Sequence, residues 1–215
     1  MKNKLSYKFS YHRRLPHIQP EAATFFLTSR LAGSLPIEVI ERLHQEKERI
    51  DRELEKIVDR EKQKEKAYFE SQLLFSKWDA ALDSSNTGID YLSDPRIANL
   101  ISESIHYRNG KVYDLIAFTI MPNHMHLIFT PLKEDIEKYY PLSKIMHSLK
   151  RHTAQEANLI LGRSGLFWQH ENYDHFVRDE AELERVIKYV LYNPVKANLA
   201  REQRDWKWSY CKYDM

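Results

Sequence analysis

The amino-acid sequence predicts an α+β fold, in which an antiparallel sheet packs against helices. Two strongly apolar stretches, 112–120 and 124–130, follow one another across a Pro122-Asn123 turn, and we expect them to pair as antiparallel strands. A third stretch rich in β-formers, Thr24–Arg30, comes earlier in the chain. Segments with the apolar spacing of amphipathic helices lie between and after these strands, in an order typical of the α+β class.

The composition limits the class of protein. With 215 residues, of which 42% are hydrophobic, we expect a single domain over 1–215 that includes a helical insertion at about 37–90. The net charge of +2 does not by itself require a nucleic-acid partner. One cysteine, Cys211, excludes a disulfide framework and argues against a cysteine-rich zinc site. The polar N-terminus and the absence of a long apolar run predict a cytoplasmic protein with no membrane span.

The insertion has a composition of its own from Ile37 to about Ser76. Glu, Lys and Arg dominate, Gly and Pro are absent after Pro36, and the sparse apolar residues follow a narrow helical stripe. We expect a solvated helix laced with salt bridges. The alternative is an arm for dimerisation or for another partner, and the sequence leaves the role of 41–76 open.

Three more helices are predicted. One spans about 94–107, because Asp94-Pro95 offers a capping acid followed by proline at the first helical position. The second spans 141–159. The third opens at Asp179 with a capping-box pattern and ends or kinks at Asn193-Pro194, because the residue before proline resists the helical conformation. Between the last two helices, the aromatic and polar segment 167–178 is expected to be a loop or short strand at the edge of a site.

His124 and His126 stand one residue apart inside the second apolar stretch. In a strand they share one face with Ile128, while Met125, Leu127 and Phe129 take the other. Two adjacent imidazoles suit a metal site, but they also suit a pair of hydrogen-bonded core histidines under a helix. The spacing alone leaves both interpretations open.

The helix that begins at Asp179 carries two tyrosines. At about 100° per residue, Tyr192 falls nearly opposite the apolar stripe, whereas Tyr189 falls at its edge with Asn193 one turn further in the same direction. On its own Tyr189 would be taken as amphipathic packing. Together with the histidines it predicts another chemistry: two imidazoles and an amide oxygen hold a divalent cation that polarises a phosphoryl oxygen, and the tyrosine attacks the phosphodiester.

Basic and aromatic side chains are available to bind the DNA that this chemistry requires. Cations contact the phosphate backbone, and aromatic rings stack on single-stranded bases. The candidates are Arg13, Arg14, Lys144, Lys150 and Arg151 for the backbone, and Phe167, Trp168 and Tyr173 for stacking.

These motifs resemble the single-tyrosine HUH transposases, and most closely the branch called REP-associated tyrosine transposases. The segments that carry the resemblance are Met121-Pro-Asn-His-Met-His126, Trp168-Gln169, Asp174-His-Phe-Val-Arg178, Tyr189-Val-Leu-Tyr-Asn-Pro-Val-Lys-Ala-Asn-Leu199, the early Tyr11-His-Arg-Arg-Leu-Pro-His17 and the late Trp208-Ser209. The resemblance covers most of the chain except about 41–90. The histidines precede the tyrosine, unlike the order in relaxases.

The resemblance implies a ferredoxin-like antiparallel sheet with the HUH histidines on a central strand. It implies a transposase that cleaves and rejoins single-stranded DNA at hairpins or palindromic repeats, through a 5′-phosphotyrosine intermediate and with Mg²⁺ or Mn²⁺. The roles it implies are metal ligation by His124, His126 and, as third ligand, Asn193, nucleophilic attack by Tyr189, and DNA contact near the site by His175 and Arg178. Asn198 stands where the family usually has glycine, and asparagine also visits the left-handed conformation.

Two other functions remain open from the sequence. A hydrolytic nuclease would use zinc or manganese held by His124, His126 and a third histidine such as His175, without a covalent intermediate. A domesticated, non-catalytic protein would bind hairpin DNA through the basic and aromatic residues alone. A homodimer is an expected partner state, since compact relatives of the family include dimers, although the branch it most resembles also suggests a monomer.

Overall fold

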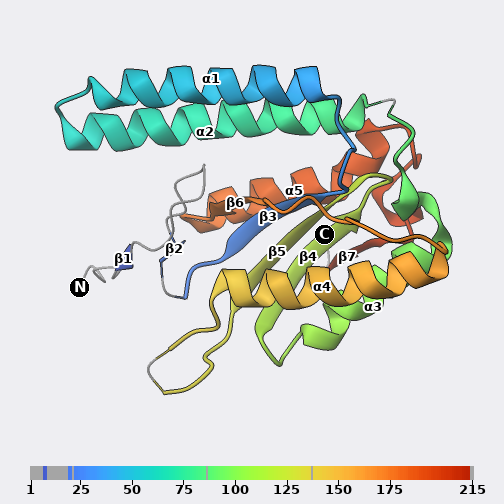
Figure 1. Ribbon diagram of the computed structural model, residues 1–215. Helices are drawn as coiled ribbons and strands as arrows, with labels where there is room; N and C mark the ends of the chain where they lie inside the picture. The colour runs from blue at the N-terminus through green and yellow to red at the C-terminus, as the bar shows by residue number, and fades with distance from the viewer. Residues whose placement is uncertain (1–6, 9–18, 21, 86, 137, 214–215) are drawn as a thin grey trace. The chain divides into compact units, whose positions relative to one another are not determined.

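The computed structural model describes residues 7–8, 19–20, 22–85, 87–136 and 138–213 (Figure 1). The elements are β1 (Tyr7–Lys8), β2 (Gln19–Pro20), β3 (Phe25–Arg30), α1 (Ile37–Glu55), α2 (Arg60–Asp83), η1 (Tyr91–Ser93), α3 (Pro95–Arg108), β4 (Tyr113–Ile120), β5 (His124–Pro131), α4 (Leu142–Ile160), β6 (Tyr173–Phe176), α5 (Glu180–Lys196), η2 (Gln203–Asp205) and β7 (Ser209–Cys211). They form two compact units: the sheet unit, residues 1–32 and 90–215, and the hairpin unit, residues 33–89. Across the described ranges, no helix combines the length and the apolar character that crossing a bilayer requires.

The sheet unit contains a five-stranded sheet in the order β6-β3-β5-β4-β7, with every neighbouring pair antiparallel. The predicted α+β class is therefore confirmed, as is the pairing of β4 with β5. The segment β3-α3-β4-β5-α4-β6 places its strands in the order β6-β3-β5-β4, which is the ferredoxin-like arrangement. The histidine strand β5 lies at the centre, with β3 and β4 on its two sides.

Strand register assigns the side chains to two faces, because residues directly opposite one another share a face. His126 lies opposite Thr28 of β3 and Thr119 of β4. On the other face, Leu127 lies opposite Leu27 and Phe118, and all three are buried. The alternation predicted for β5, with the histidines on one face and its core residues on the other, is thus confirmed.

The two faces are covered by different helices of the sheet unit (Figure 1). His106 of α3 packs edge-on against Phe118 with ring centroids 5.4 Å apart, so α3 lies on the core face. Arg108 of α3 donates to both the backbone and the hydroxyl oxygen of Ser148 on α4, at 3.1 Å each, and this joins α4 to the same side. Helix α5 covers the histidine face, since Asn193 contacts His126.

The predicted helix ends are partly correct. Asp94 caps α3 by accepting from the Arg96 amide at 2.9 Å, and Asp179 caps α5 by accepting from the Glu182 amide at 2.7 Å. The helix was expected to end or kink at Asn193-Pro194, and it does not end there, because Pro194 lies inside α5, which continues to Lys196. Proline costs a helix one backbone hydrogen bond, and a position in the last turn limits the damage.

The hairpin unit consists of α1 and α2, which lie side by side. The charged segment is therefore two helices and not one, with a break at 56–59. The break is explained by Asp59, whose carboxylate caps α2 by accepting from the amides of Glu61 and Lys62 at 3.0 and 3.3 Å. Neither glycine nor proline marks this turn, so the composition gave no sign of it.

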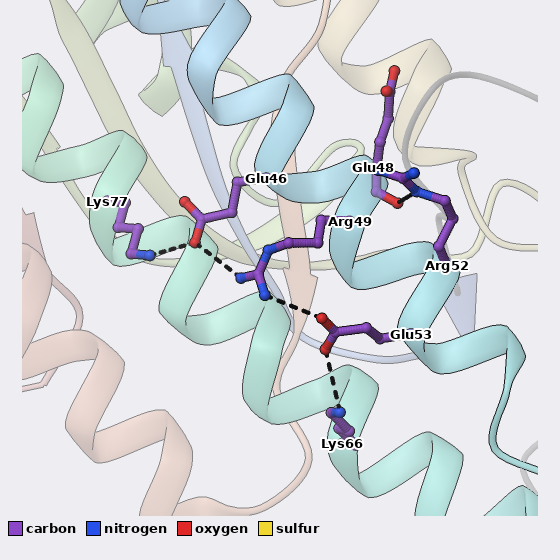
Figure 2. Close-up of polar contacts among 7 residues, drawn as sticks. All are labelled: Glu46, Glu48, Arg49, Arg52, Glu53, Lys66 and Lys77. Atoms are coloured by element: carbon purple, nitrogen blue, oxygen red, sulfur yellow. Dashed lines mark hydrogen bonds and ion pairs between the residues drawn. The ribbon is translucent and has the colours of Figure 1, made fainter.

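Salt bridges connect the two helices, as expected for this segment (Figure 2). An alternating ladder runs Lys77–Glu46–Arg49–Glu53–Lys66, with N···O distances of 2.5, 3.8, 3.1 and 3.5 Å in that order. Its first and last members belong to α2 and the other three to α1. The prediction of a helix laced with salt bridges is confirmed for this part of the chain.

Candidate active site

The histidine pair is positioned by the centre of the sheet. His124 and His126 both belong to β5, which is hydrogen-bonded on both sides, and they are 1% and 0% exposed. Their Nε2 atoms lie 3.2 Å apart, with ring centroids 4.8 Å apart. The two imidazoles therefore converge through the same ring nitrogen.

Each imidazole also makes a hydrogen bond through its other ring nitrogen, Nδ1. Nδ1 of His124 lies 2.6 Å from Oδ1 of Asn123, and Nδ1 of His126 lies 2.8 Å from the hydroxyl oxygen of Thr28. These contacts direct both Nε2 atoms into the space between the rings. A ring nitrogen bonded in this way is the arrangement found around histidine ligands of metals.

Helix α5 brings the two residues that the helical wheel placed at its edge to this pair. The Asn193 amide nitrogen donates to Nε2 of His126 at 2.8 Å. The Tyr189 ring lies edge-on to the His126 ring with centroids 5.7 Å apart, and Phe26 contacts both rings. Tyr192 is 53% exposed. The structure therefore brings Tyr189, Asn193 and the histidines together and leaves Tyr192 outside.

The residues present fit a divalent cation. Ligand atoms at about 2.1 Å from an octahedral ion stand about 3.0 Å from their neighbours around it. Nε2 of His126 lies 3.2 Å from Nε2 of His124 and 2.8 Å from the amide nitrogen of Asn193, which is close to this spacing. Oδ1 of Asn193 is buried and has no hydrogen-bond partner among the described residues. A 180° turn of the amide puts this oxygen beside His126, where it completes a set of two nitrogens and one oxygen.

His175 and Arg178 meet at a buried carboxylate. Nε2 of His175 lies 2.9 Å from Oε1 of Glu182, and the Arg178 amide donates to Oε2 at 2.8 Å. The Glu182 side chain is 3% exposed. His175 of β6 lies opposite Phe26 of β3. It is therefore one strand further from the central strand β5 than Thr28 is. These contacts tie the start of α5 to the edge strand β6.

The predicted phosphate-binding cations lie elsewhere in the sheet unit. Lys144 and Arg151 are exposed on α4, on the other side of the sheet from Tyr189, and the hydrogen bond that Lys144 donates to Glu134 raises the pKa of Lys144. Lys150 donates to the His170 carbonyl at 3.1 Å and to Oδ1 of Asn172 at 2.8 Å, so it binds the segment that leads into β6. Arg13 and Arg14 lie outside the described residues.

The expectation that 167–178 forms only the edge of a site is wrong for its first residues. Phe167 and Trp168 are 2% and 4% exposed and belong to the core, because Trp168 bridges to Leu31 just after β3 ends. The Trp168 indole nitrogen donates to the hydroxyl oxygen of Thr153 at 2.9 Å. A role of Trp168 in base stacking stays a prediction, and it requires the indole to leave this position.

Sequence reasoning missed Thr28, Asn123, Glu182 and Arg30 as neighbours of the site. Asn123 was taken as a turn residue and Glu182 as a capping residue. Thr28 and Arg30 could not be found, because the register that sets them opposite His126 and His124 joins segments about a hundred residues apart. Burial lowers the pKa of Arg30, although the nearby Glu171 acts in the opposite sense.

Two histidines on the central strand of a ferredoxin-like sheet, facing a tyrosine and an asparagine on one helix, are the arrangement implied by the resemblance to single-tyrosine HUH transposases. Residues 91–193 match the family model described as Transposase IS200 like. The resemblance is therefore confirmed over that range, which contains the histidines, Tyr189 and Asn193.

The curated relatives narrow the resemblance to one branch. A protein of Haemophilus influenzae described as a putative REP-associated tyrosine transposase is 28% identical over 103 residues, which cover 45% of this chain and 58% of the relative. The REP-associated tyrosine transposase of Escherichia coli is 23% identical over 105 residues, 49% of this chain and 58% of the relative. The match thus spans a little over half the length of these relatives.

A solved structure is also similar to this chain. It is described as a REP-associated tyrosine transposase bound to a REP hairpin, and it aligns over 93% of this chain and 81% of its own with a TM-score of 0.45 and 18% identity.

Proposed function

We propose that this protein is a metal-dependent, transposase-like endonuclease and strand transferase that acts on single-stranded DNA through Tyr189. The observation that carries the proposal is the meeting of Tyr189 and Asn193 of α5 with the histidine pair of β5. The match of 91–193 to IS200-like transposases supports the same class of reaction.

Most steps of the proposed reaction can be assigned to residues of this chain. Nε2 of His124, Nε2 of His126 and Oδ1 of Asn193 would hold Mg²⁺ or Mn²⁺, which when bound supplies Lewis-acid polarisation of a phosphoryl oxygen. The Tyr189 hydroxyl attacks the phosphorus and loses its proton. A bond forms between its oxygen and phosphorus, the bond from phosphorus to the 3′ oxygen breaks, and that oxygen leaves as a hydroxyl after taking up a proton.

The 5′-phosphotyrosine conserves the energy of the broken bond. A 3′ hydroxyl of another strand can therefore attack it, restore a phosphodiester and return Tyr189 to its free form without ATP. Phe26 contacts the rings of both Tyr189 and His126, and it holds the nucleophile beside the metal ligands. Arg30 lies opposite His124 in the register of β3 and β5, and its positive charge is proposed to act on the phosphodiester.

The proposed substrate is single-stranded DNA with a hairpin or palindromic repeat. The relatives' association with REP elements supports this substrate, and so does the charge of the sheet unit, which has 23 Lys and Arg against 18 Asp and Glu. Lys144, Arg151, His175 and Arg178 are proposed as DNA contacts. We also propose that 1–215 acts as one HUH transposase-like domain carrying its helical insertion.

The test is a covalent-adduct assay with matched tyrosine variants. The full chain is incubated with single-stranded hairpin DNA and Mn²⁺, and a denaturation-resistant protein–DNA adduct is measured. We expect Tyr189→Phe to abolish the adduct and Tyr192→Phe to leave it intact, because Tyr192 is exposed on the far side of the helix. An adduct that persists in Tyr189→Phe would overturn the assignment. Cleavage with no adduct would favour a hydrolytic nuclease, and binding with no cleavage a non-catalytic hairpin binder.

A further inference from the structure

The histidine pair rests on two residues that have no assigned role. Oδ1 of Asn123 lies 2.6 Å from Nδ1 of His124, and the Thr28 hydroxyl lies 2.8 Å from Nδ1 of His126. Asn123 and Thr28 are 8% and 7% exposed, so water competes little for these contacts. Both imidazoles are thus engaged at the ring nitrogen that points away from their partner.

The chemistry of these contacts selects one tautomer of each ring. A neutral imidazole carries one N–H, and an amide oxygen can only accept a hydrogen bond. Oδ1 of Asn123 therefore selects the Nδ1–H form of His124. For His126 the Asn193 amide, in the orientation that it takes without metal, donates to Nε2 at 2.8 Å, and the Thr28 hydroxyl, which can accept as well as donate, accepts from Nδ1–H. Both rings then present a lone pair at Nε2.

The two Nε2 atoms lie at hydrogen-bond distance, 3.2 Å apart, but with both protons on Nδ1 neither can donate to the other, so the space between them favours a donor or a cation. We propose that Asn123 and Thr28 are positioning residues that accept from Nδ1–H of His124 and His126, with the Asn193 amide supporting the same tautomer of His126 in the metal-free protein, and so prepare both Nε2 atoms for a divalent cation. This inference rests on the metal role proposed for the pair. Such second-layer hydrogen bonds are worth about 10- to 100-fold in metal affinity.

Neither side chain is needed for the local backbone structure. The turn at Asn123 is fixed by its own carbonyl, which accepts from the Leu31 amide at 2.9 Å. Thr28 lies within β3, where valine has the same branched shape and an equal preference for strands. The hydroxyl and the amide therefore act on the imidazoles, and their loss can be tested without changing the shape of the sheet.

The test compares Thr28→Val, Thr28→Ser and Asn123→Ala in the full chain. Imidazole ¹⁵N chemical shifts and long-range ¹H–¹⁵N couplings report the tautomers without metal, and electron paramagnetic resonance titration reports Mn²⁺ binding. We expect Nδ1–H for both rings of the wild type. In Thr28→Val, Nδ1–H of His126 loses its acceptor and the Asn193 amide can turn so that its oxygen accepts from Nε2–H, so His126 becomes a tautomer mixture and Mn²⁺ affinity falls about 10- to 100-fold. Thr28→Ser keeps both properties, and Asn123→Ala affects His124 in the same way.

Thr24→Val is the matched control, because its hydroxyl contacts Thr130 at 2.8 Å and, within the part of the chain that the structure describes, no imidazole. It should change neither the tautomers nor the Mn²⁺ affinity. An Nε2–H tautomer in the wild type, or unchanged affinity in a folded Thr28→Val variant, would overturn the inference while the Tyr189 adduct still stands. A wild type with the expected tautomers and no Mn²⁺ binding would overturn the metal role for both proposals, and the adduct assay reports separately on Tyr189.

Discussion

The sheet unit and the hairpin unit carry net charges of opposite sign. Residues 33–89 carry ten Lys and Arg against thirteen Asp and Glu, whereas the rest of the chain carries 23 against 18. The overall charge of +2 averages over this difference. The sheet unit has the excess of positive charge that binding DNA phosphates requires, and the hairpin unit lacks it. Among the roles open for the charged segment, its acidic balance argues against a phosphate-binding surface.

The two units also differ in the range of their contacts. In the sheet unit, His126 is held by Thr28 and Asn193, which are 98 and 67 residues away in the chain. In the hairpin unit, many ion pairs join residues three or four positions apart. The contacts at the candidate site therefore join distant segments, whereas many ion pairs of the hairpin unit lie within one helix, where water can replace them.

The sharpest test of this difference compares the same substitution in each unit. Phe129 is fully buried and stacks on Tyr113 at 4.6 Å, while Phe69 of α2 is 59% exposed. We expect Phe129→Ala to lower the free energy of unfolding by about 3–5 kcal/mol, because it leaves a cavity in the core. Phe69→Ala should stay within about 0.5 kcal/mol. Chemical denaturation followed by circular dichroism measures both, and equal losses would break the comparison.

What the sequence could predict follows the same division between local and distant contacts. The alternation along β5 and the wheel of α5 depend on nearby residues, so the faces of His124, His126, Tyr189 and Asn193 were correctly placed. The register of β3 against β5 depends on tertiary pairing, so the contact of Thr28 was out of reach.

The errors have both distant and local causes. Trp168 has a polar and aromatic sequence context that resembles a surface loop, yet it is drawn into the core by its bridge to Leu31. The break after α1 depends on a cap by Asp59, and nothing else in the sequence around it, neither glycine nor proline, marks a turn. Pro194 was expected to end or kink α5, but the helix continues past it to Lys196, because one lost hydrogen bond in the last turn is tolerated.

The C-terminal ends of α5 in the sheet unit and α1 in the hairpin unit differ in backbone conformation. After α5 the chain turns at Asn198, whose φ of +57° is left-handed as its glycine-like position suggested, whereas α1 ends at Lys56 with a right-handed φ of −77°. We expect Asn198→Ala to cost about 1 kcal/mol of unfolding free energy, and Asn198→Gly to cost nothing or to stabilise slightly.

The matched variant is Lys56→Gly, which should destabilise the hairpin by about 0.5–1 kcal/mol, because glycine gains nothing at a right-handed position. Thermal unfolding of Asn198→Ala, Asn198→Gly and Lys56→Gly ranks the three variants by stability. A stabilising Lys56→Gly would contradict the difference between the two helix ends.

The smallest effect is expected in the ion-pair ladder of the hairpin unit (Figure 2). Arg49 stands at its centre, between Glu46 and Glu53, and its side chain is 58% exposed. Arg49→Ala should therefore lower the free energy of unfolding by no more than about 1 kcal/mol, because exposed ion pairs lose most of their attraction to solvent and to side-chain ordering. The loss should shrink further between low and high salt, since mobile ions screen the remaining attraction. Urea unfolding of wild type and Arg49→Ala at two salt concentrations measures both effects. A larger loss that salt does not change would mean that the Arg49 stem stabilises the hairpin by packing, and the hairpin would then depend on side-chain packing much as the sheet unit does.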